Sequence, residues 1–91
     1  MFEWDEHNLR KIRAHQIERR EVEQALSNDP VLVYDQTSEA EVRYVYYGES
    51  DRGRLLAVVI TERRQKIRVI NAYDLDAGQK RDYLARRYEE N

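Results

Sequence analysis

The spacing of hydrophobic residues predicts two helices in the first third of the chain. Leu9 and Ile12 are three residues apart, which indicates a helix that begins after Asp5 and ends near His15. Asp5 is itself a typical N-cap residue. A second apolar stripe predicts a helix over Glu18–Leu26, and the single proline of the chain stops it soon afterwards, because proline cannot continue a helix.

Beyond the proline the period of the pattern changes from about 3.6 residues to 2, which is typical of strands. Four segments rich in β-branched and aromatic residues are predicted as an antiparallel meander: Val31–Tyr34, Val42–Tyr47, Leu55–Thr61 and Ile67–Tyr73. The third is apolar almost throughout and is expected at the centre of the sheet. In the fourth, strict alternation places Arg68 and Ala72 on one face and Asn71 on the other.

The two ends of the chain add one element each. Phe2 and Trp4 alternate with acidic residues, a short strand signal, and Asp76 followed by Gln79 has the spacing of a capping box before helical spacing that continues to the end. The order β-α-α-β-β-β-β-α predicts one α+β domain over residues 1–91. We expect a small antiparallel sheet packed with two N-terminal helices and one C-terminal helix.

Composition removes several classes of function. Without cysteine the chain has no disulfide, thiol nucleophile or cysteine-ligated metal, and with only two histidines we expect no metal site. Its glycines are too far apart for a nucleotide-binding loop, so no cofactor is expected. The longest apolar run, Leu55–Ile60, is too short for a membrane span, and the first residues do not resemble a signal peptide, which favours the cytoplasm.

Charge is balanced overall but unevenly distributed. Sixteen Lys and Arg residues against eighteen Asp and Glu residues give a formal net charge of -2, which argues against nonspecific coating of nucleic acid. The cations are mostly arginine and occur in runs, among them Arg52/Arg54 and Arg63–Arg64. We therefore expect a locally cationic face on an acidic protein.

Two arginines and a histidine are the candidates for chemistry. Arg43 and Arg68 each lie mid-strand between hydrophobic residues, where a rigid backbone would position the planar guanidinium well for a phosphate. The alternative is an ordinary solvated or salt-bridged arginine. His15 lies between the two predicted helices, where it either caps the first helix or transfers protons near neutral pH.

Seven tyrosines accompany these residues, either as packing or as planes on which unpaired bases stack. Arginine, tyrosine and histidine suffice for RNA cleavage without metal, in which the ribose 2′-hydroxyl attacks the adjacent phosphate. That reaction needs a base, an acid for the departing oxygen and cations for the charge on the phosphoryl oxygens.

Several segments in order also resemble a known family. They are Phe2–Asn8 with His15, Asp29–Pro30, Glu41–Tyr44 with Gly48, Gly53–Leu56, Ile67–Ile70 and Lys80–Arg81 before Tyr83. Together they are similar to the BrnT-type toxins. The resemblance implies a compact fold like that of the RelE ribonuclease toxins, toxicity through RNA cleavage, and neutralisation by a ribbon-helix-helix antitoxin that brings the complex to DNA.

The chain differs from that family pattern at two informative positions. Gln16 stands where the family commonly has a glycine, so this residue is expected to end the first helix in left-handed geometry. Tyr73 stands where members of the toxin type usually have a cation.

The leading hypothesis is a BrnT-like, metal-independent endoribonuclease. Arg43 and Arg68 hold the scissile phosphate, His15 or Tyr73 transfers protons, and the RNA backbone is guided by further arginines, namely Arg54, Arg63 and Arg64. One alternative is an interaction module that binds the antitoxin but has lost activity. Another is a homo-oligomer whose tyrosine face is an interface.

Overall fold

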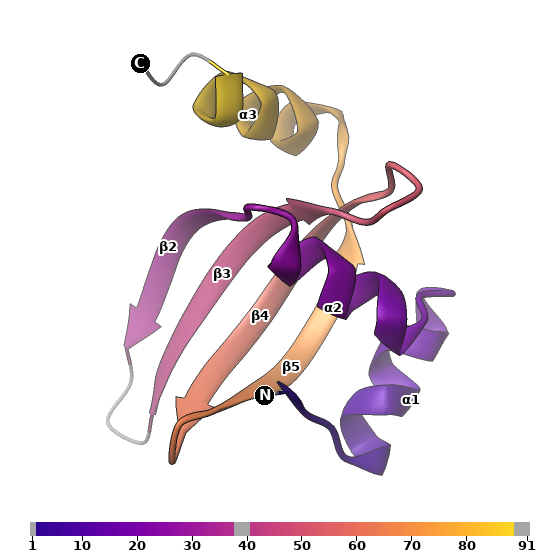
Figure 1. Cartoon of the computed structure of the whole chain (residues 1–91), viewed down its shortest axis with the longest axis vertical. Coiled ribbons are helices and arrows are strands. Elements are labelled where there is room, and N and C mark those ends of the chain that lie inside the picture. Colours follow the sequence, from indigo (N-terminus) through magenta and orange to yellow (C-terminus); the bar gives the residue numbers. More distant parts are fainter. Residues whose placement is uncertain (1, 38–40, 89–91) are drawn as a thin grey trace.

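The computed structural model describes residues 2–37 and 41–88 and shows one sheet with three helices in this part of the chain (Figure 1). The elements follow the predicted order: β1 (Phe2–Glu3), α1 (Glu6–Ala14), α2 (Arg19–Ser27), β2 (Val31–Thr37), β3 (Val42–Glu49), β4 (Leu55–Arg63), β5 (Lys66–Asp74) and α3 (Ala77–Tyr88). None of the described helices is long and apolar enough to cross a membrane.

The sheet has the strand order β1-β5-β4-β3-β2. Strands β2 to β5 form the predicted antiparallel meander, with the apolar β4 at the centre. The sheet as a whole is mixed, however, because β1 lies parallel to β5, with Phe2 opposite Ile67 and Glu3 opposite Arg68. A two-residue strand carries no sequence signal for its partner, so this parallel edge was not predicted.

The two faces of the sheet are covered differently. Helices α1 and α2 lie over one face, where Ile12, Val22 and Ala25 pack against Val58 and other strand residues. On the opposite face a second cluster forms around Val45 and Tyr47, against which α3 contributes Tyr83. Figure 1 shows α3 at one end of the sheet rather than along it. We call the side of the sheet opposite α1 and α2 the arginine face, because the side chains of Arg43 and Arg68 leave the sheet on this side.

Local capping explains where the helices begin and end. The Asp5 carboxylate accepts a hydrogen bond from the backbone N–H of Asn8 at 2.8 Å, as expected of an N-cap. Asp76 and Gln79 exchange the two reciprocal bonds of a capping box, at 2.8 and 3.0 Å, before α3. Gln16 has φ of 59°, which confirms the left-handed turn expected after α1.

Two β-bulges change which side chains share a face. One lies where β4 and β5 pair, because Val59 is opposite Asn71 while Ile60 is opposite Val69. The extra residue shifts the alternation by one, so Ala72 packs with the helices and Asn71 joins the face of Arg68. The strict alternation predicted for this strand is therefore wrong beyond Val69. The second bulge lies between Leu32 and Tyr34 of β2.

Candidate nucleic-acid interface

Arg43 and Arg68 lie in one row across the arginine face. Arg43 of β3 is opposite Thr61 of β4, and Thr61 is opposite Arg68 of β5. Residues that are directly opposite on neighbouring strands project their side chains to the same face. Two strand spacings separate the arginines, so their Cα atoms are about 10 Å apart. The two arginine side chains therefore leave the same face of a rigid sheet, and the Arg68 guanidinium reaches Asp5, the N-cap of α1.

Each of these arginines has one carboxylate partner. Arg43 Nε lies 2.7 Å from Glu41 Oε2, and Arg68 Nη2 lies 2.9 Å from Asp5 Oδ2. The arginine side chains are 42% and 32% exposed, so water screens both ion pairs and weakens them. An RNA phosphate can compete with such a carboxylate for the guanidinium.

The β4–β5 hairpin adds cations at the same end of the sheet. Its turn residues Arg64 and Gln65 both have positive φ, at 52° and 67°, which is the geometry of a type I′ hairpin. Arg63 and Lys66 are opposite each other on the arginine face. A depression of about 430 Å³ is lined by Glu3 and by three cations of the hairpin, Arg63, Arg64 and Lys66. Since Glu3 is opposite Arg68, this depression adjoins the arginine row.

The other end of the arginine face is aromatic. Tyr47 and Tyr73 both lie opposite Ala57, one on each side of it, and Tyr34 is opposite Val45. By simple alternation from Leu32 and Val69, Tyr34 and Tyr73 would point towards the helices. The two bulges turn both side chains to the arginine face.

The protonation of these tyrosines follows from their packing. Burial raises the pKa of Tyr73, and the neighbouring Tyr34 and Tyr47 raise it further. Burial likewise raises the pKa of Tyr47, against a lowering effect of its hydrogen bond with Gln79. Both phenols are therefore protonated near neutral pH, so each can donate a proton or a hydrogen bond but is a poor base there.

His15 lies away from the arginine row. It is the C-cap of α1 and is exposed, and its carbonyl oxygen accepts a bond from Arg54 Nη2 at 3.2 Å. Arg54 also binds Asp74, the last residue of β5. Arg68 is six residues earlier in that strand, about 20 Å away along it. The structure thus brings Tyr73, but not His15, onto the face of the two arginines.

Arg54, which we expected to bind RNA, is held by the protein itself. Its Nε and Nη2 form a bidentate pair with Asp74 at 2.7 and 3.0 Å. Nη1 lies 3.2 Å from Glu21 Oε1 and 2.9 Å from the carbonyl oxygen of Gln16. These bonds, of which the one to Asp74 has the largest effect, raise the pKa of Arg54. The side chain ties the α1–α2 junction to the sheet.

Three residues of this surface were not among the predicted site residues. Thr61, which is 5% exposed, lies between the two arginines and donates a hydrogen bond to the carbonyl oxygen of Val42 at 2.8 Å. Lys66 extends the cationic end, and Tyr34 the aromatic end. Alternation along the predicted strand Leu55–Thr61 could have placed Thr61 on this face. The position of Tyr34 depends on a bulge that the sequence pattern does not indicate.

Comparison with known families identifies the family of this chain. A family model described as the ribonuclease toxin BrnT of type II toxin-antitoxin systems matches residues 4–78. The chain belongs to this BrnT family. The matched stretch contains Arg43, Arg68 and Tyr73, and it ends at the beginning of α3. No curated protein proved similar to the chain.

Membership in the BrnT family confirms the resemblance seen in the sequence. BrnT proteins are the ribonuclease toxins of type II toxin-antitoxin systems, so an antitoxin is the partner of this chain. Within the described residues, no three histidine or acidic side chains form a group that could hold a metal ion.

Proposed function

We propose that this toxin cleaves RNA on its arginine face without a metal ion. The observation that carries the proposal is the row of Arg43, Thr61 and Arg68 in one register, with Tyr73 turned to the same face by a bulge. Two permanent cations on neighbouring parts of a rigid sheet would bind one phosphate and stabilise the charge that builds on its oxygens during cleavage.

The reaction follows from the groups that this face carries. The ribose 2′-hydroxyl gives its proton to water as its oxygen attacks the phosphorus, the bond from phosphorus to the 5′-oxygen breaks, and a 2′,3′-cyclic phosphate remains. We assign the proton that the 5′-oxygen needs to Tyr73 rather than to His15, because Tyr73 shares the face of the arginines and its phenol is protonated near neutral pH. Tyr73 is opposite Ala57, which lies about 13 Å from Thr61 along β4, so the scissile phosphate has to lie between the arginine row and Tyr73.

The other predicted RNA-binding arginines have different roles. Arg63 and Arg64, together with Lys66, guide the RNA backbone through the depression at the hairpin. Arg54 contributes indirectly, because its bonds to Asp74 and Glu21 hold the end of β5 in place. RNA then crosses the sheet from the cationic end to the aromatic end, and the toxin acts on it in the cytoplasm.

The partner is proposed to be a ribbon-helix-helix antitoxin, through which the complex reaches DNA.

A second candidate function is an antitoxin-binding module without activity. One observation favours it: both arginines of the row already have carboxylate partners, Glu41 and Asp5. RNA would have to displace these carboxylates.

An assay for cleavage of a single-stranded RNA by the purified chain decides between the ribonuclease and the inactive antitoxin-binding module. We expect cleavage that survives EDTA and falls about 100-fold in Arg43→Ala and in Arg68→Ala. The matched control is Arg86→Ala, which removes an arginine that pairs with Asp82 on exposed α3. Absence of cleavage by the parent chain would favour the inactive module, and equal activity in all variants would remove the role of the arginine row.

A further inference from the structure

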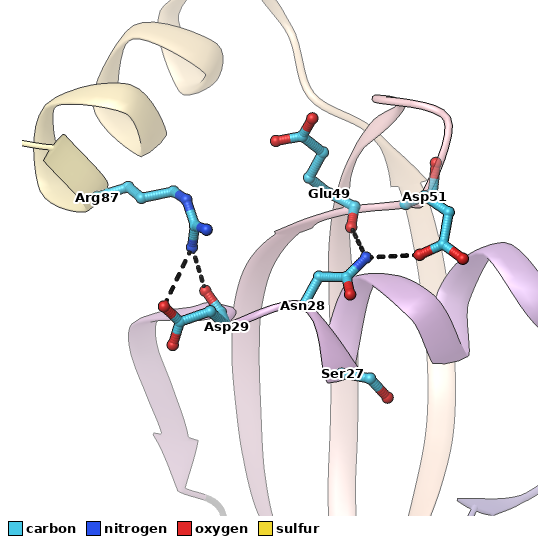
Figure 2. A pocket seen from close by; sticks show the side chains of 7 residues that line it. Ser27, Asn28, Asp29, Glu49, Asp51 and Arg87 are labelled. Atoms are coloured by element: carbon cyan, nitrogen blue, oxygen red, sulfur yellow. Dashed lines mark hydrogen bonds and ion pairs between the residues drawn. The ribbon is translucent and has the colours of Figure 1, made fainter.

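A groove with the opposite charge lies at the far end of the sheet. It has a volume of about 530 Å³ and lies between the end of α2, the turn after β3, and α3 (Figure 2). The carboxylates of Asp29, Glu49 and Asp51 line it, together with the single cation Arg87. In the described part of the chain, neither Glu49 nor Asp51 has a cationic side chain as partner.

Hydrogen bonds fix the walls of this groove. Asn28 donates through Nδ2 to the carbonyl oxygen of Glu49 and to Asp51 Oδ1, both at 2.9 Å. From α3, Arg87 Nη1 donates to the carbonyl oxygen of Asp29 at 2.7 Å and lies 3.6 Å from its carboxylate. Figure 2 shows Arg87 reaching towards Asp29 while the Glu49 carboxylate points away from Asn28. The groove is therefore preformed and keeps an excess of negative charge.

Two buried donors beside the groove lack acceptors. The side chain of Tyr83 is fully buried, yet its hydroxyl has no hydrogen-bond partner, and neither has Arg87 Nε. The Tyr83 hydroxyl is close enough to Glu49, Asp29 and Arg87 for their charges to act on its pKa, which burial raises. Buried donors without acceptors are rare because they cost free energy. The packing of α3 against the sheet beside the groove therefore leaves two polar atoms unsatisfied.

The groove continues into a second depression along an open strand edge. Asp29 and Arg87 also line a neighbouring depression that reaches Val31 and Leu32 of β2. Strand β2 is an edge of the sheet, and its Leu32 side chain is 48% exposed. An edge strand offers unpaired backbone groups to an extended segment of another chain.

We propose that an extended segment of the antitoxin docks here, with a lysine or arginine side chain in the carboxylate groove and apolar residues along β2. The proposal rests on the proposed function for the identity of the partner and goes beyond it by assigning the surface. Charge decides against RNA as the occupant, because the three carboxylates repel phosphate. The toxin thus separates its RNA surface, which is cationic, from its protein-binding surface, which is anionic.

The test uses the antitoxin encoded beside the gene of this chain, titrated against the purified toxin by calorimetry. Glu49→Lys should weaken binding by about 10- to 100-fold, because it places a cation where the antitoxin has one. The matched control is Glu6→Lys, the same charge change in the first turn of α1, and it should change the affinity less than about threefold. Amide hydrogen exchange of the complex should show protection over residues 28–33 and 49–51.

Other results would overturn the proposal. Equal affinity for Glu49→Lys and Glu6→Lys, or protection confined to α1, would place the antitoxin elsewhere. Protection of β2 that rises with toxin concentration in the absence of antitoxin would identify a second copy of this chain as the occupant. RNA cleavage by Glu49→Lys should equal that of the parent chain. If no RNA is cleaved but Glu49→Lys still loses the antitoxin, only the proposed nuclease function fails.

Discussion

Arg54 differs from Arg43 and Arg68 in how many groups of the protein bind its guanidinium. Arg54 binds two carboxylates and two main-chain carbonyl oxygens, whereas Arg43 and Arg68 have one carboxylate partner each. A guanidinium whose donors are used within the protein cannot bind a ligand without breaking the fold. The number of its partners within the protein therefore separates an arginine that stabilises the fold from one that is available to RNA.

The largest expected effect is a loss of RNA cleavage when the proton donor on the arginine face is removed. Tyr73→Phe keeps the ring beside Tyr47 but removes the proton donor, so cleavage should fall about 100-fold while the fold is unchanged. Rates of RNA cleavage measure the loss, and circular dichroism checks the fold. Tyr88→Phe on exposed α3 is the control. A Tyr73→Phe protein as active as the control would exclude Tyr73 as the proton donor.

The next effect concerns stability. Arg54→Ala should lower the free energy of unfolding by about 2 kcal/mol, because it leaves Asp74 and Glu21 without their cation. For a domain of this size the midpoint of thermal unfolding would fall by roughly 10 °C. Arg43→Ala should cost less than about 1 kcal/mol, since its ion pair is exposed. Urea denaturation of both variants tests this order, and an equal loss would contradict the comparison.

Gln16→Gly should produce a smaller effect of opposite sign. The backbone of Gln16 is left-handed, with φ of 59°, and glycine adopts this geometry without strain. The carbonyl oxygen that accepts from Arg54 is kept, so the free energy of unfolding should rise by about 1 kcal/mol with cleavage unchanged. Thermal unfolding checks the sign. A destabilised Gln16→Gly protein would show that the glutamine side chain matters more than backbone strain.

The smallest effect is a dependence of stability on pH. The hydrogen bond from Arg54 holds the pKa of Asp74 below its ordinary value of 3.8. A carboxyl with a lowered pKa stabilises the fold above that ordinary value, and the stabilisation is lost as pH falls through the lowered pKa. Because Asp74 is largely exposed, we expect only about 0.5 kcal/mol. Urea denaturation near pH 6 and pH 3 should show a loss of stability that is larger by this amount in the parent chain than in Arg54→Ala.

The sequence predicted the elements well because the signals for them are local. Asp5 and the Asp76–Gln79 pair cap helices from within three residues, and the left-handed position of Gln16 follows directly from where α1 ends. The parallel pairing of β1 with β5 was missed, since it joins residues more than 60 positions apart and a two-residue strand has no periodicity.

The candidate site was less accessible to sequence reasoning than the fold. Alternation alone placed Arg43 and Arg68 mid-strand, but their common row depends on the register through Thr61. Tyr73 reaches the arginine face only because of a bulge. Arg54 looked like another exposed cation because its partners Asp74 and Glu21 lie 20 and 33 residues away in the sequence.

Nuclear magnetic resonance of the arginine Nε–H groups tests most directly whether Arg43 and Arg68 bind RNA while Arg54 does not. The toxin is titrated with a single-stranded RNA whose 2′-hydroxyls are methylated, so that it binds but cannot be cleaved. The account predicts that the signals of Arg43 and Arg68 shift together and saturate at the same RNA concentration, while that of Arg54 stays in place. A shift of Arg54 without a shift of Arg43 and Arg68 would contradict it.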